Sequence, residues 1–141
     1  MNRLGKLLGV LACCATLAGA APALAAGRIS VELNKLETVG AGCRVYMVFA
    51  NGTAGAISSY KPDLVLFGKD GVIAERLVVE GGPLPAGKTR VKLFDVQGLA
   101  CAAVGQVLLN DLRACEGAGT DAAACLEATD TSSRAGVEFI K

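Results

Sequence analysis

Apolar and polar residues alternate along several short segments of the chain, which is typical of half-buried β-strands. Residues 29–34 place an apolar side chain at every second position, and residues 43–49 do the same. Cys43 belongs to the apolar row of the second segment, so we expect it to face the core. Asn51-Gly52 then gives a turn signal after this strand.

A hairpin is predicted in the middle of the chain. The apolar segments 63–67 and 72–79 flank a short Gly-Lys-Asp-Gly stretch, and Asp70-Gly71 is a strong hairpin signal. Glu75 lies on the same face of its segment as apolar residues. We therefore expect a bulge in this second strand or an edge position for it.

Residues 89–93 alternate again, with Val91 and Leu93 in one row and Arg90 and Lys92 in the other. The simplest interpretation is an apolar row toward the core and a basic row toward solvent. Basic side chains on an edge strand deter strand-to-strand aggregation. We favour that role for Arg90 and Lys92, with contact to an acidic partner or to anionic lipid as the alternative.

The rest of the chain predicts little helix. Residues 104–109 are nearly all apolar, as in a central strand, and residues 137–139 suggest a last short strand. Residues 121–128 read as a helix with Thr120 as its cap, and residues 130–133 as a flexible stretch. About seven short strands and one short helix near the C-terminus predict a mainly β protein, an antiparallel β-sandwich.

The first 25 residues have the pattern of a secretory signal peptide. Arg3 and Lys6 precede an uncharged apolar run over residues 7–21, and small residues then lead to a cleavage site after Ala25. The run is too short and too rich in Ala and Gly for a spanning helix. We therefore divide the chain into a signal peptide, 1–25, and a single domain, 26–141.

A lipid-anchored form is the alternative for this segment. Cys13 or Cys14 would then be the lipid-accepting residue. Leu11 stands where a lipoprotein signal prefers a small side chain before Cys13, and Cys13 stands there before Cys14. We favour the interpretation of both as small apolar residues of the signal peptide.

Four cysteines remain after export into an oxidising space, which indicates two disulfides. Three pairings are possible for Cys43, Cys101, Cys115 and Cys125. We prefer Cys115–Cys125, which closes a short Gly- and Ala-rich loop, and Cys43–Cys101, which joins distant segments across the core. Each disulfide contributes about 3–4 kcal/mol through loop entropy. The absence of a C-x-x-C pair disfavours a zinc site and thiol redox chemistry.

The residues around the predicted hairpin carry a family resemblance. Residues 64–73 and 84–89 resemble the FxLYD-type immunoglobulin-like domains of bacterial envelope proteins, with Phe67 and Gly68 where that pattern has Tyr and Asp. The resemblance covers roughly residues 28–95 and implies an immunoglobulin-like form of the sandwich. The whole chain, with its Leu-Leu-Asn-Asp run before Cys115, also looks like a group of uncharacterised exported bacterial proteins. Those are usually labelled by a twin-arginine signal, which this chain lacks, and the group implies no activity.

Candidate catalytic residues are few. The chain has no His, so the usual serine triad lacks its base. Serine–lysine chemistry would have to use Ser58, Ser59 and Lys61, which we interpret as a polar loop. Carboxylate chemistry would have to use residues that we interpret as solvated edge charges: Glu75, Glu80, Asp95 and Asp111. Asn51-Gly52-Thr53 matches a glycosylation sequon, although a turn explains it equally well.

Charge and composition limit the classes of partner that we expect the protein to bind. The formal charge is +1, and removal of residues 1–25 leaves 12 basic against 13 acidic residues, which disfavours nucleic acid. We expect a non-catalytic exported protein, periplasmic in a Gram-negative-type envelope or secreted, that binds or supports another envelope protein. We expect no cofactor, no metal and no stable membrane insertion after signal removal. The alternatives are a small envelope hydrolase that uses carboxylates or Ser/Lys, and a lipid-anchored surface module.

Overall fold

The computed structural model describes residues 27–117 and 119–141, which form eight strands and one short α-helix. The predicted signal peptide and its two cysteines, Cys13 and Cys14, lie outside the described residues. The strands are β1 (Ile29–Val39), β2 (Gly42–Asn51), β3 (Ile57–Gly68), β4 (Ile73–Val78), β5 (Thr89–Val96), β6 (Val104–Gly117), β7 (Thr129–Ser133) and β8 (Glu138–Ile140). A 3-10 turn, η1 (Cys101–Ala103), precedes β6, and α1 (Ala122–Glu127) precedes β7.

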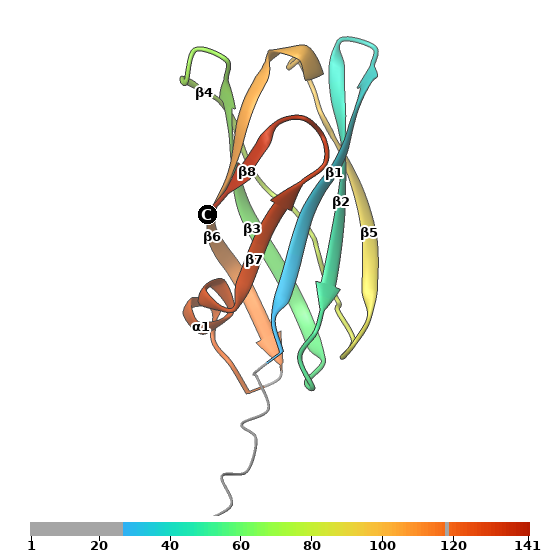
Figure 1. Ribbon diagram of the computed structural model, residues 1–141, viewed down its shortest axis with the longest axis vertical. Coiled ribbons are helices and arrows are strands. Elements are labelled where there is room, and N and C mark those ends of the chain that lie inside the picture. Colours follow the sequence, from blue (N-terminus) through green and yellow to red (C-terminus); the bar gives the residue numbers. More distant parts are fainter. Residues whose placement is uncertain (1–26, 118) are drawn as a thin grey trace, which may run out of the picture.

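The strands form two four-stranded sheets (Figure 1). The first sheet has the order β5-β2-β1-β7 and the second has the order β4-β3-β6-β8. The β1–β7 and β6–β8 pairs are parallel and the other pairs are antiparallel, so both sheets are mixed. The predicted mainly β, sandwich-like fold with one short helix near the C-terminus is confirmed. The structure has eight strands where we predicted about seven, and the parallel β1–β7 and β6–β8 pairs depart from the predicted antiparallel arrangement.

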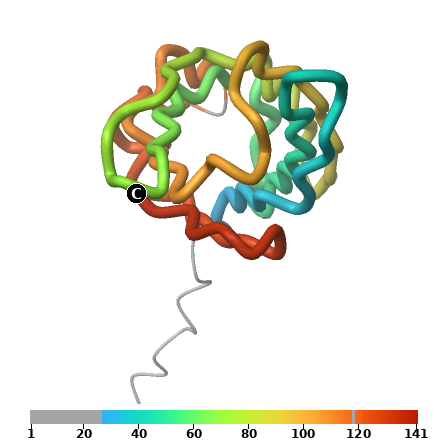
Figure 2. The backbone as a smooth tube through the Cα atoms, turned by 90° about the horizontal axis from the view of Figure 1, so that it is seen from above, coloured from blue at the N-terminus to red at the C-terminus, as the bar shows by residue number. Residues whose placement is uncertain are grey.

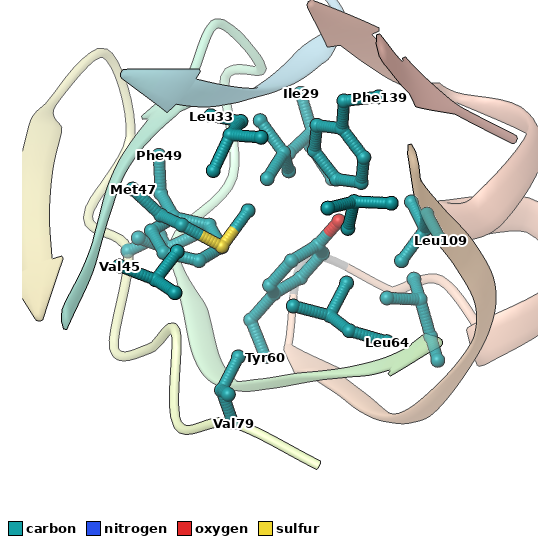
Figure 3. Close-up of a cluster of buried hydrophobic side chains, with 14 of the residues drawn as sticks. Ile29, Leu33, Val45, Met47, Phe49, Tyr60, Leu64, Val79, Leu109 and Phe139 are labelled. Carbon is teal, nitrogen blue, oxygen red and sulfur yellow. The ribbon is translucent and has the colours of Figure 1, made fainter. Parts of the chain in front are cut away.

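The core lies between the two sheets. Seen from above, the backbone surrounds a central space (Figure 2), which buried side chains from both sheets fill (Figure 3). The apolar rows predicted in residues 29–34 and 43–49 both face this core. Fully buried members include large side chains from β1, β2, β3 and β6: Ile29, Leu33, Met47, Phe49, Tyr60, Leu64 and Leu109.

Both preferred disulfides are present. Cys43 is fully buried at the start of β2 and bonds to Cys101 in η1, so this bridge links the first sheet to the entry into β6. Cys115 near the end of β6 bonds to Cys125 in α1, which fixes the helix to the second sheet. Two disulfides fit an oxidising compartment outside the cytoplasm.

The predicted hairpin joins β3 and β4. Gly71 has φ +78°, a conformation that favours glycine, and the Val72 N–H is held by the Asp70 carboxylate at 3.0 Å. The strand that contains Glu75 lies at the edge of the second sheet, and the β3–β4 register shifts between Leu66 and Phe67. Both features agree with the expected edge position or bulge.

The C-terminal region differs from expectation. Residues 130–133, predicted to be flexible, belong to β7, which pairs with β1. Thr129 at the start of β7 is buried, where its hydroxyl meets the Tyr60 hydroxyl at 2.9 Å and donates to the Cys125 carbonyl at 2.7 Å. The sequence did not predict this strand because its residues are polar. Hydrogen bonds to neighbouring residues, rather than apolar contacts, hold the strand in place. The helix cap is Asp121, whose carboxylate accepts from the third residue beyond it, and not Thr120.

The orientation of β5 also differs from expectation. Phe49, a buried core residue of β2, lies opposite Arg90, and directly opposed residues of an antiparallel pair share a face. Arg90 and Lys92 therefore stand in the core-side row of this strand. Val91 and Leu93, predicted to face the core, are on the outer row and are 59% and 54% exposed.

Across residues 27–117 and 119–141, no helix has the length and the apolar character needed to cross a bilayer.

Candidate binding surface

The exposed large apolar residues are concentrated on two strands. Seven such residues occur in the described part of the chain, and five of them belong to β4, β5 or the turn before β4: Val72, Ile73, Val78, Val91 and Leu93. Both strands end their sheets, β4 in the second and β5 in the first. Exposed apolar residues that lie close together mark interaction sites more often than scattered ones do, and each of these two strands carries such a group.

The same side of the sandwich holds both edges. β7 and β8 contact each other and link the opposite edges of the two sheets (Figure 1), so β4 and β5 border the other side. Residues 79–88 connect β4 to β5 and cover the core there, with Leu84 fully buried. Gly82 allows this close approach, because a Cβ atom at that position would lie 2.7 Å from the Tyr60 nitrogen. We call the side of the sandwich that β4 and β5 border the open-edge side.

A polar cluster lies beside the exposed apolar residues of the first sheet. On β2, the Tyr46 hydroxyl donates to Glu37, and the Lys35 ammonium lies 5.1 Å from the Tyr46 ring centre. The hydrogen bond from Tyr46 lowers the pKa of Glu37 and raises that of Tyr46. This cluster is already satisfied internally and leaves the β5 row as the exposed apolar part of the face.

A buried carboxylate lies in the second sheet. Asp63 in β3 is fully buried, yet it accepts two hydrogen bonds from Arg76 of β4, at 3.0 and 2.6 Å, and one contact from Arg113 of β6 at 2.8 Å. The Arg76 hydrogen bonds, opposed by burial and helped by both positive charges, lower the pKa of Asp63 to about 2. This cluster ties three strands together. The sequence signal for this cluster is a carboxylate at the start of an apolar segment. We did not predict the cluster from that signal.

The candidate serine–lysine residues lie in a strand rather than a loop. Ser58, Ser59 and Lys61 all belong to β3. The Ser58 hydroxyl donates to the Glu116 carbonyl at 3.1 Å, and the Lys61 ammonium lies 3.4 Å from the Glu80 carboxylate. The Ser58 and Lys61 side chains are thus each engaged with a residue outside β3.

The candidate carboxylates are divided between the two sheets. Asp95 lies in β5 of the first sheet, where Arg44 binds it at 2.7 and 2.9 Å and lowers its pKa. Glu75 lies in β4 and Asp111 in β6, both in the second sheet, and Glu80 lies in the connection between β4 and β5. Within the described residues, no group of three or more His, Cys, Asp or Glu side chains is placed to hold a metal ion.

The sequon asparagine is buried. Asn51 is 1% exposed, and its amide nitrogen donates to the Gly55 and Leu84 carbonyls at 2.8 and 2.9 Å. Its side-chain oxygen accepts from the Thr53 N–H and hydroxyl. Asn51 therefore organises the turn after β2, and the folded protein does not present it for modification.

No family model, no curated protein and no solved structure matches the chain.

Proposed function

We propose that the chain is a non-catalytic exported protein, periplasmic or secreted, that binds or supports another envelope protein. The observation that carries the proposal is the concentration of exposed large apolar residues on the open-edge side. A free-standing domain would be expected to shield such edges, because unpaired strands invite association.

The disulfides add support of a different kind. Cys43–Cys101 and Cys115–Cys125 brace both ends of β6. A braced sandwich offers its edge strands in a fixed geometry, which lowers the ordering cost of binding. Preorganised edges of this kind suit recognition of a partner surface.

Site-specific photo-crosslinking in the producing organism tests the proposal. A photo-reactive residue is placed singly at Val78 or Val91 on the open-edge side, with Ser132 of β7 as the matched exposed control on the opposite side. We expect one protein to be captured from Val78, Val91 or both, and none from Ser132. Failure to capture any protein from the two apolar positions, in protein that is correctly folded, overturns the proposal.

The exported state has its own test. The intact mass of the native protein, measured before and after reduction with alkylation, should correspond to a chain that starts at Ala26. Cys43, Cys101, Cys115 and Cys125 should become alkylated only after reduction. A chain that starts at Cys13 or Cys14 with added acyl mass would establish the lipid-anchored alternative instead.

A further inference from the structure

The unpaired backbone edge of β5 is the starting point. The Asn51 N–H of β2 donates to the Lys88 carbonyl at 2.9 Å. In an antiparallel ladder, every second residue after Lys88 then forms its backbone hydrogen bonds with β2. By this alternation, the N–H and C=O groups of Val91 and Leu93 point away from β2. Within the described residues β5 pairs with β2 alone, and the register between them runs without a shift. β5 thus offers a regular ladder to one more strand.

The other three sheet edges are poorer templates. β4 has 6 residues and borders a register shift, β7 has 5 residues of polar sequence, and β8 has 3 residues. β5 has 8 residues and no shift. Short or irregular strands and charged side chains, above all inward-pointing ones, are the usual protection against strand addition. β5 is neither short nor irregular. Its charged residues, Arg90 and Lys92, oppose a basic or apolar strand at this edge but not an acidic one.

The two side-chain rows of β5 define what an added strand must carry. The outer row presents Val91 and Leu93, both more than half exposed. The core-side row presents Arg90 and Lys92 at the rim of the sandwich. Residues opposite one another on neighbouring strands interact most strongly when apolar meets apolar and acid meets base. The matching strand therefore alternates apolar residues on its outer row with acidic residues on its other row.

We propose that β5 binds an extended segment of a partner protein in which acidic residues alternate with apolar ones, and adds that segment to the first sheet as a fifth strand. The inference rests on the proposed function and names the surface and the chemistry of its partner. Recognition by strand addition takes affinity from the backbone ladder and specificity from the alternate side chains.

A second copy of this chain fits the same edge less well. In the twofold antiparallel register that sets Val91 against Leu93 of the second copy, Lys92 lies opposite Lys92. Like charges directly opposite one another destabilise a strand pair. The charge pattern therefore favours an acidic segment over self-association.

A peptide titration tests the proposal on the disulfide-bonded protein. The probe is a fluorescein-labelled peptide of the length of β5, 8 residues, in which Glu alternates with Val. One comparison peptide has the same composition with all Glu residues grouped at one end. A second has Lys in place of Glu, and a third is N-methylated at every second residue along one edge. Fluorescence anisotropy should show saturable binding of the alternating acidic peptide, with each comparison peptide about tenfold weaker or worse, which corresponds to about 1.4 kcal/mol.

Charge reversal supplies the specificity test. Arg90→Glu/Lys92→Glu should weaken the acidic peptide by about tenfold or more and should create binding of the Lys peptide. Lys69→Glu, in the exposed β3–β4 turn, is the matched control and should change neither affinity. Circular dichroism and the thermal transition of each variant confirm that the sandwich is intact.

Four results overturn the proposal. Equal binding of the grouped or N-methylated peptide would show charge attraction without strand addition. Acidic-peptide binding that survives Arg90→Glu/Lys92→Glu would remove β5 from the site. A dimer in sedimentation that Val91→Glu dissociates would assign β5 to a second copy. Crosslinks from Val78 alone would refute the β5 assignment while the proposed function stands, so the two failures are distinguishable.

Discussion

Removal of the buried carboxylate Asp63 is the sharpest test of the structure. The Asp63 carboxylate accepts hydrogen bonds from Arg76 and forms an ion pair with Arg113. The three residues link β3, β4 and β6. Asp63→Asn keeps the shape of the side chain but removes the charge. A pKa lowered from 3.8 to about 2 corresponds to about 2.4 kcal/mol of preference for the folded state. Both guanidinium groups are about half exposed, so solvent screening reduces the expected loss to about 1–2 kcal/mol at neutral pH.

The pH dependence gives a second, independent signal. The folded pKa of Asp63 lies below the unfolded one, so the unfolded chain binds more protons between the two values. The stability that Asp63 contributes is therefore present above about pH 4 and is lost as the pH falls toward about 2. The difference in stability between wild type and Asp63→Asn should shrink across that window.

Urea unfolding, followed by circular dichroism at a series of pH values from about 2 to about 7, measures both effects. Glu116→Gln, which removes an exposed charge from β6 of the same sheet, is the control and should change stability by less than about 0.5 kcal/mol. A difference between wild type and Asp63→Asn that stays constant down to about pH 2 would refute the assigned ion pairs. So would an Asp63→Asn protein as stable as wild type at neutral pH.

Further substitutions probe other contacts. Tyr60→Phe removes the hydroxyl that meets Thr129, and we expect a loss of about 1 kcal/mol in urea unfolding, since the Thr129 hydroxyl keeps its bond to the Cys125 carbonyl. Burial raises the pKa of Tyr60 to about 12, so its absorbance should stay that of the neutral phenol at pH 11 until the protein unfolds. Cys115→Ala/Cys125→Ala opens the loop that holds α1, and we expect a loss of about 3 kcal/mol and faster proteolysis near the helix. Asp95→Asn breaks a partly exposed ion pair and should change thermal stability by less than about 0.5–1 kcal/mol.

The parts of the fold that the sequence predicted well are those that apolar periodicity controls. The strands around Val31 and Met47 are buried on one face, so their alternation marks the core directly. The hairpin at Gly71 follows from local turn chemistry. The disulfide pairing came from the same logic, because Cys43 shares the core-facing row of its strand and Cys101 lies far away in the chain.

Other elements escaped prediction because tertiary contacts decide them. β7 has few apolar residues, and it forms because Thr129 is buried between Tyr60 and the end of α1. Ser59 and Lys61 belong to a strand because β6 pairs with them across the sheet, a partner that local sequence does not reveal. The buried position of Asp63 likewise depends on arginines from two other strands.

The orientation of β5 was predicted wrongly for one physical reason. Alternation separates the two faces of a strand, but it does not say which face meets the core, and for an interior strand the apolar row settles that question. At an edge, the core-side row also reaches solvent at the rim, so Arg90 and Lys92 can occupy it without being buried. Val91 and Leu93 are then left on the outer face, where more than half of each residue stays exposed. The proposed strand partner would account for this orientation of β5, and the peptide titration on β5 tests that explanation directly.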